Sequence, residues 1–421
     1  MEKIASFVRS HIDHVLLALG VPVLLFGLFS PGEKSAASAP PAPALVFTQW
    51  WQDELEEGAL ESLVSDFEEI HPEIKVELRR IPYEEARRRR LAPPEAGGQD
   101  LGDLAAMDPL WGAAPGGGGT LESPAAALSA PFQEIPVLTF FCPLFYNVKI
   151  LRAAGFSRPP KTADEFLSYA EKAADPGAGV YGLVMALESG NYRGLYQDIY
   201  SWIWASGGRL IKDGKPAVTS REVTGAIAFL AALGRGNLLH PESFDFDEET
   251  KREAFIKGGS VFMIAPVQDA EILRRRMGEE SFGFSSIPAP GSYSGKPVFG
   301  AFGWSLGISP RSGRKEEAGT FAAFLAERSS YLAEKLHAVP GNAGNPSPAA
   351  QNDPFYSKAW DLCISGDFIQ DFAEIRESAD LAAVFRGELP HLLLSPSPEA
   401  EAAGTAAAIQ RQWEEILGKA E

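Results

Sequence analysis

Residues 45–78 (LVFTQWWQDELEEGALESLVSDFEEIHPEIKVEL) decide the predicted fold class. The opening LVFTQWW has the apolar and aromatic composition of a buried strand. Residues 53–70 then place apolar side chains at helical spacing, namely Leu55, Ala59, Leu63, Val64, Phe67 and Ile70. His71 precedes Pro72, which disfavours further helix, and apolar and charged residues alternate over 74–79 as in a strand. This strand–helix–strand order predicts a partly parallel sheet.

Outward from this unit, strand and helix patterns alternate over most of residues 45–330, which predicts an α/β fold. Thr162 and Glu165 form a capping-box pattern that opens another helix. An aromatic helix around residues 200–205 ends at Gly207-Gly208. We predict further strands at residues 181–187, 282–287, 298–302 and 305–308, and helices at residues 83–91, 315–325 and 406–417.

The run Arg87-Arg88-Arg89-Arg90 is a concentrated local charge. Glu84 and Glu85 lie four residues before Arg88 and Arg89, which is the favoured orientation of ion pairs on a helix. We therefore interpret the run as a solvated helix face, with a patch for an anion or a nucleic acid as the alternative.

Length and charge restrict the class of protein. At about 100–200 residues per domain, a chain of 421 residues fits two domains or one large bilobal domain. Lys plus Arg number 38 and Asp plus Glu number 56, a net charge of −18 at pH 7. The affinity of a protein for a nucleic-acid duplex comes largely from Lys and Arg side chains that neutralise phosphates. Because acidic residues are in excess here, we expect no nucleic-acid partner.

The cysteines and histidines of the sequence give little support for a metal site or a disulfide framework. Cys142 and Cys363 are the two cysteines, too few for a disulfide framework, a zinc cluster or an iron–sulfur motif. We expect two unpaired thiols, with one bridge between them as the alternative. The histidines outside the leader lack metal spacing, namely His71, His240, His337 and His391. We therefore expect no metal site and no cofactor.

The N-terminal segment indicates export. Residues 15–29 (VLLALGVPVLLFGLF) are uncharged, and as a helix they would be roughly 22 Å long, shorter than a hydrocarbon core of about 30 Å. Ala37-Ser38-Ala39 fits a signal cleavage site, and residues 35–44 have the composition of a linker. A cleaved signal and an uncleaved membrane anchor both stay open, and a helix of the folded domain is a third reading. We expect the remainder to lie outside the cytoplasm, in the periplasm or at the cell surface.

Several motifs follow one another in a characteristic order. Residues 67–76 (FEEIHPEIKV) join a helix to a strand, residues 144–147 read LFYN, and residues 154–166 (AGFSRPPKTADEF) are the most specific piece. WASGG at 204–208, FIKG at 255–258 and GWSLGIS at 303–309 come next. Taken together over residues 45–345, this order resembles the extracellular solute-binding proteins of ABC importers, in the sugar-binding family similar to maltose-binding protein.

The resemblance implies a bilobal periplasmic-binding-protein-like fold, with discontinuous α/β lobes joined by hinge strands. We expect a leader or anchor with a linker at 1–44, a first lobe of 45–136 plus 266–310, and a second lobe of 137–265 plus 311–421 with a helix-rich C-terminus. Two departures from the family stand out. The stretch between Arg90 and Ile135 is short and rich in Gly and Pro, and no lipid-anchoring cysteine follows the apolar run.

A sugar presents C–H faces and many hydroxyls, so its site combines aromatic plates with planar polar side chains. From the resemblance and this chemistry, we predict ligand contacts from Trp51, Asp108, Tyr146, Trp204, Gln268 and Trp304. Core packing is the competing explanation for each tryptophan. Trp50 and Trp51 are adjacent on an extended segment and face opposite ways, so at most one serves a cleft. Asp53 and Glu54 could contact ligand, or simply favour a helix N-terminus.

We therefore predict a non-enzymatic, monomeric receptor that captures a small solute, a carbohydrate, between two lobes and delivers it to an ABC transporter permease. The N-terminal segment would connect it to the membrane. One alternative is an anchored sensor or structural surface protein that has lost transport. Another is a serine hydrolase, because residues 303–307 match the Gly-x-Ser-x-Gly elbow around Ser305, although the following residues look extended.

Overall fold

The computed structural model describes residues 43–91, 100–108, 134–189, 191–336, 338–340, 352–369, 371–372, 375, 377–394 and 398–419. The predictions for residues 1–42, including the signal or anchor, lie outside the described residues. Residues 45–421 form one unit, to which both sheets below belong. No helix among the described residues is both long and apolar enough to cross a membrane.

The first sheet contains seven strands among the described residues, with the order β12-β4-β11-β3-β1-β2 and β13 paired to β11. These strands are β1 (Leu45–Gln49), β2 (Val76–Arg80), β3 (Leu104–Met107), β4 (Glu134–Phe141), β11 (Val298–Ile308), β12 (Val339–Pro340) and β13 (Asp367–Ile369). β1 pairs in parallel with β2 and β3, whereas β11 runs antiparallel to β3 and β4. The sheet is therefore mixed, with the parallel part where the strand–helix–strand pattern predicts it.

The connection from β1 to β2 differs in detail from its prediction. Helix α2 (Ala59–Ile70) begins six residues later than predicted, because the chain first forms a 3-10 turn, η1 (Trp51–Asp53), and then passes through Gly58 at φ 82°. Leu63 and Phe67 are buried as expected. Ile70 was assigned to the apolar face but is 57% exposed, because it lies at the last helical position.

The second sheet contains four strands among the described residues, in the order β10-β5-β9-β6. They are β5 (Leu144–Asn147), β6 (Tyr181–Val184), β9 (Ser260–Ile264) and β10 (Phe282–Ser285). β9 lies parallel to β6 and antiparallel to β5. All five residues of β9 are buried, because the strand has a neighbour on each side and helices pack on the sheet.

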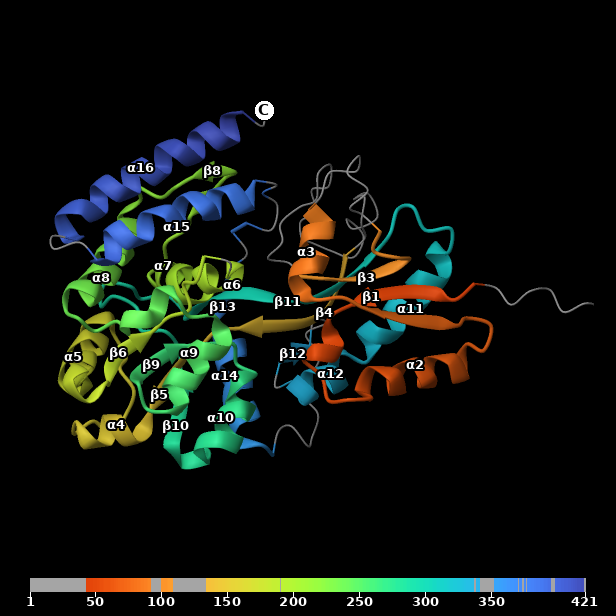
Figure 1. Ribbon diagram of the computed structural model, residues 1–421, viewed down its shortest axis with the longest axis horizontal. Helices are drawn as coiled ribbons and strands as arrows, with labels where there is room; N and C mark the ends of the chain where they lie inside the picture. Colours follow the sequence, from red (N-terminus) through yellow and green to blue (C-terminus); the bar gives the residue numbers. More distant parts are fainter. Residues whose placement is uncertain are drawn as a thin grey trace, which may run out of the picture. The chain divides into compact units, whose positions relative to one another are not determined.

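Two groups of helices accompany the sheets (Figure 1). Around the first sheet lie α2, α3 (Tyr83–Leu91), α11 (Lys315–Glu327) and α12 (Ser329–Leu336). Around the second lie α4 (Val148–Ala153), α5 (Ala163–Ala173), α6 (Tyr192–Gly194), the π-helix η6 (Leu195–Tyr200), α7 (Ser201–Ala205), α8 (Arg221–Arg235), α9 (Glu248–Ile256), α10 (Asp269–Met277), α14 (Pro354–Ser365), α15 (Ser378–Leu394) and α16 (Pro398–Gly418). Shorter elements are η5 (Pro176–Ala178), η7 (Pro241–Phe244), η8 (Glu279–Ser281) and the hairpin β7 (Ile211–Lys212) with β8 (Lys215–Pro216).

The chain passes between the two sheets more than once. β4 leads through Cys142 and Pro143 directly into β5, and the chain returns from β10 to β11. The two long strands β4 and β11 pair with each other along most of their length. The fold is therefore α/β with two lobes joined by strands, as predicted.

Strand pairing divides the lobes differently from the expected boundaries at two segments. β10 pairs with β5 of the second sheet, although residues 266–310 were assigned to the first lobe. α11 and α12 pack against β4 of the first sheet, although residues 311–421 were assigned to the second. We propose lobe boundaries that follow the sheets, with residues 266–285 in the second lobe and residues 315–336 in the first.

The segment around Ser305 is a continuous strand. The predicted strands at 298–302 and 305–308 join into β11, with an irregular register between Trp304 and Ser305. The buried Ser305 hydroxyl donates to the Met107 carbonyl at 3.3 Å. A nucleophile elbow requires a sharp turn from strand to helix at the serine, so the Gly-x-Ser-x-Gly match does not form one.

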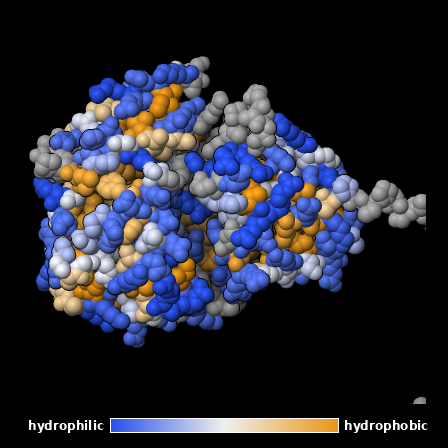
Figure 2. All heavy atoms as spheres, viewed as in Figure 1, coloured by the Kyte–Doolittle hydropathy of each residue, from blue (hydrophilic) through white to orange (hydrophobic). Residues whose placement is uncertain are grey.

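Hydrophilic side chains dominate the face of the molecule in Figure 2, and hydrophobic residues on this face form scattered groups. This distribution fits a chain in which 22% of the residues are charged. Cys142 is buried and Cys363 is partly buried, and both are free thiols.

Candidate functional site

Two of the predicted tryptophans lie directly against each other. Trp51 belongs to η1, just after β1, and Trp304 belongs to β11. Their rings stack with centroids 4.4 Å apart and an interplanar angle of 8°. Both side chains are buried, and the Trp51 Nε1 has no hydrogen-bond partner among the described residues.

Further rings extend this stack along β11. Phe140 of β4 lies 5.9 Å from Trp304 and 5.7 Å from Phe302, measured between ring centroids. At the other end, Trp204 of α7 packs so closely on Gly300 that a Cβ there would lie 2.2 Å from the indole. We call Trp51, Trp304, Phe140, Phe302 and Trp204 the aromatic row. It runs from η1 of the first lobe to α7 of the second.

An acidic group lies beside the aromatic row. Asp108, directly after β3, is buried and accepts a hydrogen bond from the Tyr83 hydroxyl at 2.8 Å. Tyr83 opens α3, and its ring meets the edge of Trp50 with centroids 5.2 Å apart. Glu54 lies nearby, and its carboxyl has a raised pKa. Burial is the main cause. The Arg193 charge opposes it, and the Asp108 charge adds to it.

Arg193 of α6 reaches this acidic group from the second lobe. Its Nη2 lies 3.2 Å from Asp108 Oδ2, and its Nη1 lies 3.9 Å from Glu54 Oε1. The guanidinium also lies over the Tyr83 ring, 4.0 Å from the centroid, which is cation–π geometry. Burial alone would lower the pKa of Arg193, but its neighbours Tyr83, Asp108 and Glu54 raise it above the ordinary value.

Hydrogen bonds fix the segment that carries Arg193. Asn191 caps α6 by accepting from the Gly194 amide at 3.0 Å, and it donates to Ala186 and to Glu248. Arg386 of α15 donates to the carbonyls of residues 188, 189 and 191. Arg193 therefore extends from a backbone that is held on two sides.

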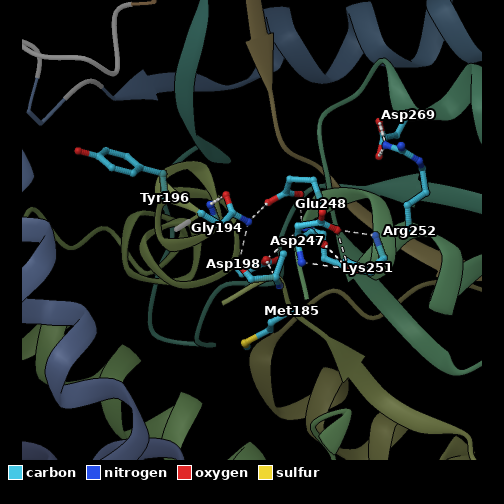
Figure 3. Close-up of polar contacts among 12 residues, drawn as sticks. Met185, Gly194, Tyr196, Asp198, Asp247, Glu248, Lys251, Arg252 and Asp269 are labelled. Atoms are coloured by element: carbon cyan, nitrogen blue, oxygen red, sulfur yellow. Dashed lines mark hydrogen bonds and ion pairs between the residues drawn. The ribbon is translucent and has the colours of Figure 1, made fainter. Parts of the chain in front are cut away.

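A buried charge cluster lies behind this segment (Figure 3). The Lys251 ammonium lies 3.0 Å from Asp198 Oδ2 and 2.7 Å from Glu248 Oε2. Asp198 belongs to the π-helix η6 and also accepts from the Ala186 amide at 2.8 Å. The cluster therefore connects η6, α9 and the loop after β6, and it supports α6.

Burial dominates the titration of this cluster. It raises the pKa of Asp198 to about 7, although the Lys251 charge acts in the opposite direction. Among the described residues, no group of three or more His, Cys, Asp or Glu side chains could hold a metal ion. The cation that lies between the Asp198 and Glu248 carboxylates is the Lys251 ammonium.

The remaining predicted site residues lie apart from the Trp51–Trp304 pair. Tyr146 of β5 lies across Gly283 of β10, and the Lys358 ammonium lies 5.9 Å from its ring centroid. Gln268 precedes α10, and its side-chain oxygen is buried without a partner among the described residues. Trp204 lies at the far end of the aromatic row, and its Nε1 donates to Asp371 at 3.0 Å.

Sequence reasoning missed Arg193 and Tyr83. Arg193 is the single cation in residues 186–200, where it lies between turn-forming residues and an aromatic run. This isolated position was the one feature of the sequence that could have indicated a site residue. Tyr83 opens a helix that was interpreted only as a charged surface. Trp50 and Trp51 do not continue the extended segment, because Trp50 has helical angles (φ −114°, ψ −2°), and each tryptophan contacts a different ring.

The site combines stacked indoles, a buried carboxylate and unpartnered donors. The Trp51 Nε1 and the Arg193 Nε are buried N–H groups with no acceptor among the described residues. Hydroxyl groups can accept from such donors and also donate to carboxylates. The arrangement therefore suits a polyhydroxylated molecule with an apolar face.

Comparison with known proteins gives a matching family. The family model described as bacterial extracellular solute-binding protein matches residues 50–330. A protein of Deinococcus radiodurans, named probable ABC transporter-binding protein, is 27% identical over 186 residues, which are 43% of this chain and 44% of that protein. The chain thus spans less than half the length of this relative.

Several solved structures share the fold. Maltose-bound MalE3 of T. maritima superposes with a TM-score of 0.70 at 20% identity, covering 89% of this chain and 100% of that chain. The GacH receptor of Streptomyces glaucescens GLA.O, solved unliganded and with acarbose, gives 0.68 at 18% identity over 90% and 99%. The cyclic alpha-maltosyl-1,6-maltose binding protein of Arthrobacter globiformis gives 0.67 at 16% identity over 89% and 100%. At these identities, the likeness establishes the bilobal α/β fold.

Proposed function

The chain belongs to the bacterial extracellular solute-binding protein family, and from this membership we propose that it is the receptor of an ABC importer that captures a carbohydrate between its lobes. Membership in an extracellular family places the protein outside the cytoplasm. The carbohydrate, the permease and the attachment of the N-terminal segment to the membrane are parts of the proposal.

The observation that carries the proposal is the aromatic row beside Asp108 and Arg193. Stacked indoles bury the C–H face of a sugar, whereas a carboxylate such as that of Asp108 bonds its hydroxyls. The unpartnered Nε1 of Trp51 is a donor that a sugar hydroxyl can satisfy. We propose Trp51, Trp304 and Asp108 as the first-lobe contacts, with Trp204, Tyr146 and Gln268 as second-lobe contacts.

Names of the similar structures support the substrate class. MalE3 is bound to maltose, the GacH receptor was solved in complex with acarbose, and the third protein is named for binding cyclic alpha-maltosyl-1,6-maltose. Solute that bridges both lobes stabilises the closed state by its differential affinity for that state. We expect micromolar binding, which corresponds to about −8 kcal/mol.

Isothermal titration calorimetry over a panel of neutral oligosaccharides tests the proposal. At least one sugar is expected to bind with micromolar affinity and to reduce the radius of gyration measured by small-angle X-ray scattering. Trp51→Leu is expected to weaken that binding at least tenfold, about 1.4 kcal/mol, through loss of the indole plate.

Trp413→Leu is the matched control, because Trp413 is equally buried and its Nε1 donates to Leu381 within the C-terminal helices. Circular dichroism verifies that both variants fold. The carbohydrate proposal fails if no sugar binds at millimolar concentration, or if both variants weaken binding equally.

A further inference from the structure

Arg193 of the second lobe contacts the acidic side chains of the first lobe. It extends from α6, next to the second sheet, whereas Asp108 directly follows β3, Glu54 directly follows η1 and Tyr83 opens α3, all next to the first sheet. We propose that Arg193 is a positioning residue, whose ion pair with Asp108 raises the fraction of closed molecules before a solute arrives, so that a solute closes the remainder. The inference rests on the proposed function, because these lobes are taken to be the ones that close around a solute.

Geometry supports a strong contact at this point. The Nη2 to Oδ2 distance of 3.2 Å between Arg193 and Asp108 is a charge-assisted hydrogen bond. Glu54 adds a second carboxylate at 3.9 Å, and the Tyr83 ring covers one face of the guanidinium. The Arg193 side chain is 20% exposed and that of Asp108 is 0% exposed, so solvent screens the pair only in part.

Charge balance makes opening unfavourable. The Arg193 guanidinium lies 3.2 Å from the Asp108 carboxylate and 3.9 Å from the Glu54 carboxyl, so opening would separate a cation from two acidic groups. Withdrawing Arg193 would break its charge-assisted hydrogen bond to the fully buried Asp108 carboxylate. Removing one partner of a buried charge pair is unfavourable, and this cost favours the closed arrangement.

The supporting network gives Arg193 a defined starting position. Glu248 and Arg386 hold Asn191, which directly precedes α6 and caps it. Buried Lys251 in turn ties Glu248 to Asp198 in the next turn. A side chain that projects from such a fixed segment loses little conformational freedom when the ion pair forms.

Solution scattering of the solute-free protein tests the inference. We expect Arg193→Gln to increase the radius of gyration, because the variant replaces the charged guanidinium with a shorter, neutral amide. Arg193→Lys retains a cation and is expected to remain close to wild type. Asp108→Asn removes the opposite charge with an isosteric side chain and is expected to expand the protein as Arg193→Gln does.

Arg158→Gln is the matched control. Arg158 also belongs to the second lobe, but it pairs with Glu165 at 2.7 Å on the same lobe's surface, so its loss should leave the radius of gyration unchanged. Circular dichroism verifies folding in each variant. A solute-free radius of gyration that is equal in wild type, Arg193→Gln and Asp108→Asn overturns the inference.

Solute binding gives a separate readout. If Arg193 populates the closed state in advance, Arg193→Gln should weaken a sugar about tenfold, since the competent fraction falls. Failure of every sugar to bind wild type contradicts the proposed function but leaves the scattering result as evidence for the ion pair. Sugar binding without any expansion of Arg193→Gln contradicts the ion pair and leaves the proposed function standing.

Discussion

At the scale of single residues, Trp304 and Trp51 serve the packing of the first lobe whether or not a solute is present. Trp304 is buried between the Trp51 ring and the Phe140 ring. Any binding role is therefore superimposed on a packing role, and the two must be measured separately. Affinity reports the first, and the free energy of unfolding reports the second.

Trp304→Ala is expected to lower the free energy of unfolding by about 3–5 kcal/mol, because it removes a fully buried ring and leaves a cavity. Urea denaturation followed by circular dichroism measures the change. Ile364→Ala provides the contrast, since Ile364 is 63% exposed and should change stability by about 0.5 kcal/mol or less. Equal effects of the two substitutions would contradict the packing of Trp304 described here.

Asp198 gives a prediction about pH. Burial raises the pKa of Asp198 to about 7 from an ordinary value of 3.8. Between these values the folded protein holds a proton that the unfolded chain has lost, so this group adds stability as pH falls below 7. The added stability is complete below pH 3.8 and is lost as pH rises through 7.

Comparison with Asp198→Asn isolates this contribution. Urea midpoints measured at pH 8 and pH 5 should show wild type gaining stability relative to the variant at the lower pH. The side-chain amide of the variant does not titrate. The difference between the two proteins therefore removes the contribution of all other titrating groups. Parallel pH dependence in the two proteins would show that Asp198 does not titrate in this range.

At the scale of elements, local patterns predicted much of the fold. The apolar residues of α2 and the alternation of β2 gave the parallel pair with β1, because burial of one face leaves its period in the sequence. The predicted start of α2 was wrong. The helical spacing of apolar residues extends upstream of Gly58, but the chain forms a turn there, which Gly58 allows at φ 82°. The Thr162–Glu165 capping box was half right: Thr162 accepts from the Glu165 amide, but Glu165 accepts from Lys161 and pairs with Arg158.

The site was less predictable than the elements. Trp51, Trp304 and Asp108 were chosen from their places after strands or within a late strand, and the structure brings them together. Arg193 could not be found in this way, because its partners lie 85 residues away for Asp108 and farther still for Glu54. This ion pair depends on how the two lobes contact each other, and the local spacing of apolar and polar residues carries no information about that contact.

Packing between α7 and β11 gives a prediction at this scale. Gly300→Ala would place a Cβ 2.2 Å from the Trp204 ring, so the strand or the helix must shift. We expect a loss of about 1–3 kcal/mol in the free energy of unfolding, measured with urea. Gly291→Ala is the control, because nothing lies within 4 Å of the added atom. A Gly300→Ala protein as stable as that control would exclude the close contact.

At the scale of the whole molecule, the motif order predicted the bilobal fold, but the lobe boundaries depend on which sheet each strand joins. β10 follows a helix and a turn with no local mark of its partner, and its pairing with β5 reflects contacts across more than a hundred residues. α11 follows β11 and packs back on the same sheet. Chain order alone did not distinguish these arrangements from the expected ones.

A solute that bridges both lobes should stabilise the molecule as one unit. Binding only to the folded state adds about 2.7 kcal/mol to the free energy of unfolding when the solute concentration is about one hundred times Kd. We therefore expect a neutral sugar that binds in calorimetry to raise the thermal midpoint in a single shifted transition. A sugar that contacts one lobe alone would instead separate the transitions, leaving the other lobe at its original midpoint. Differential scanning calorimetry at several sugar concentrations distinguishes these results, and two transitions with one fixed midpoint would contradict capture between the lobes.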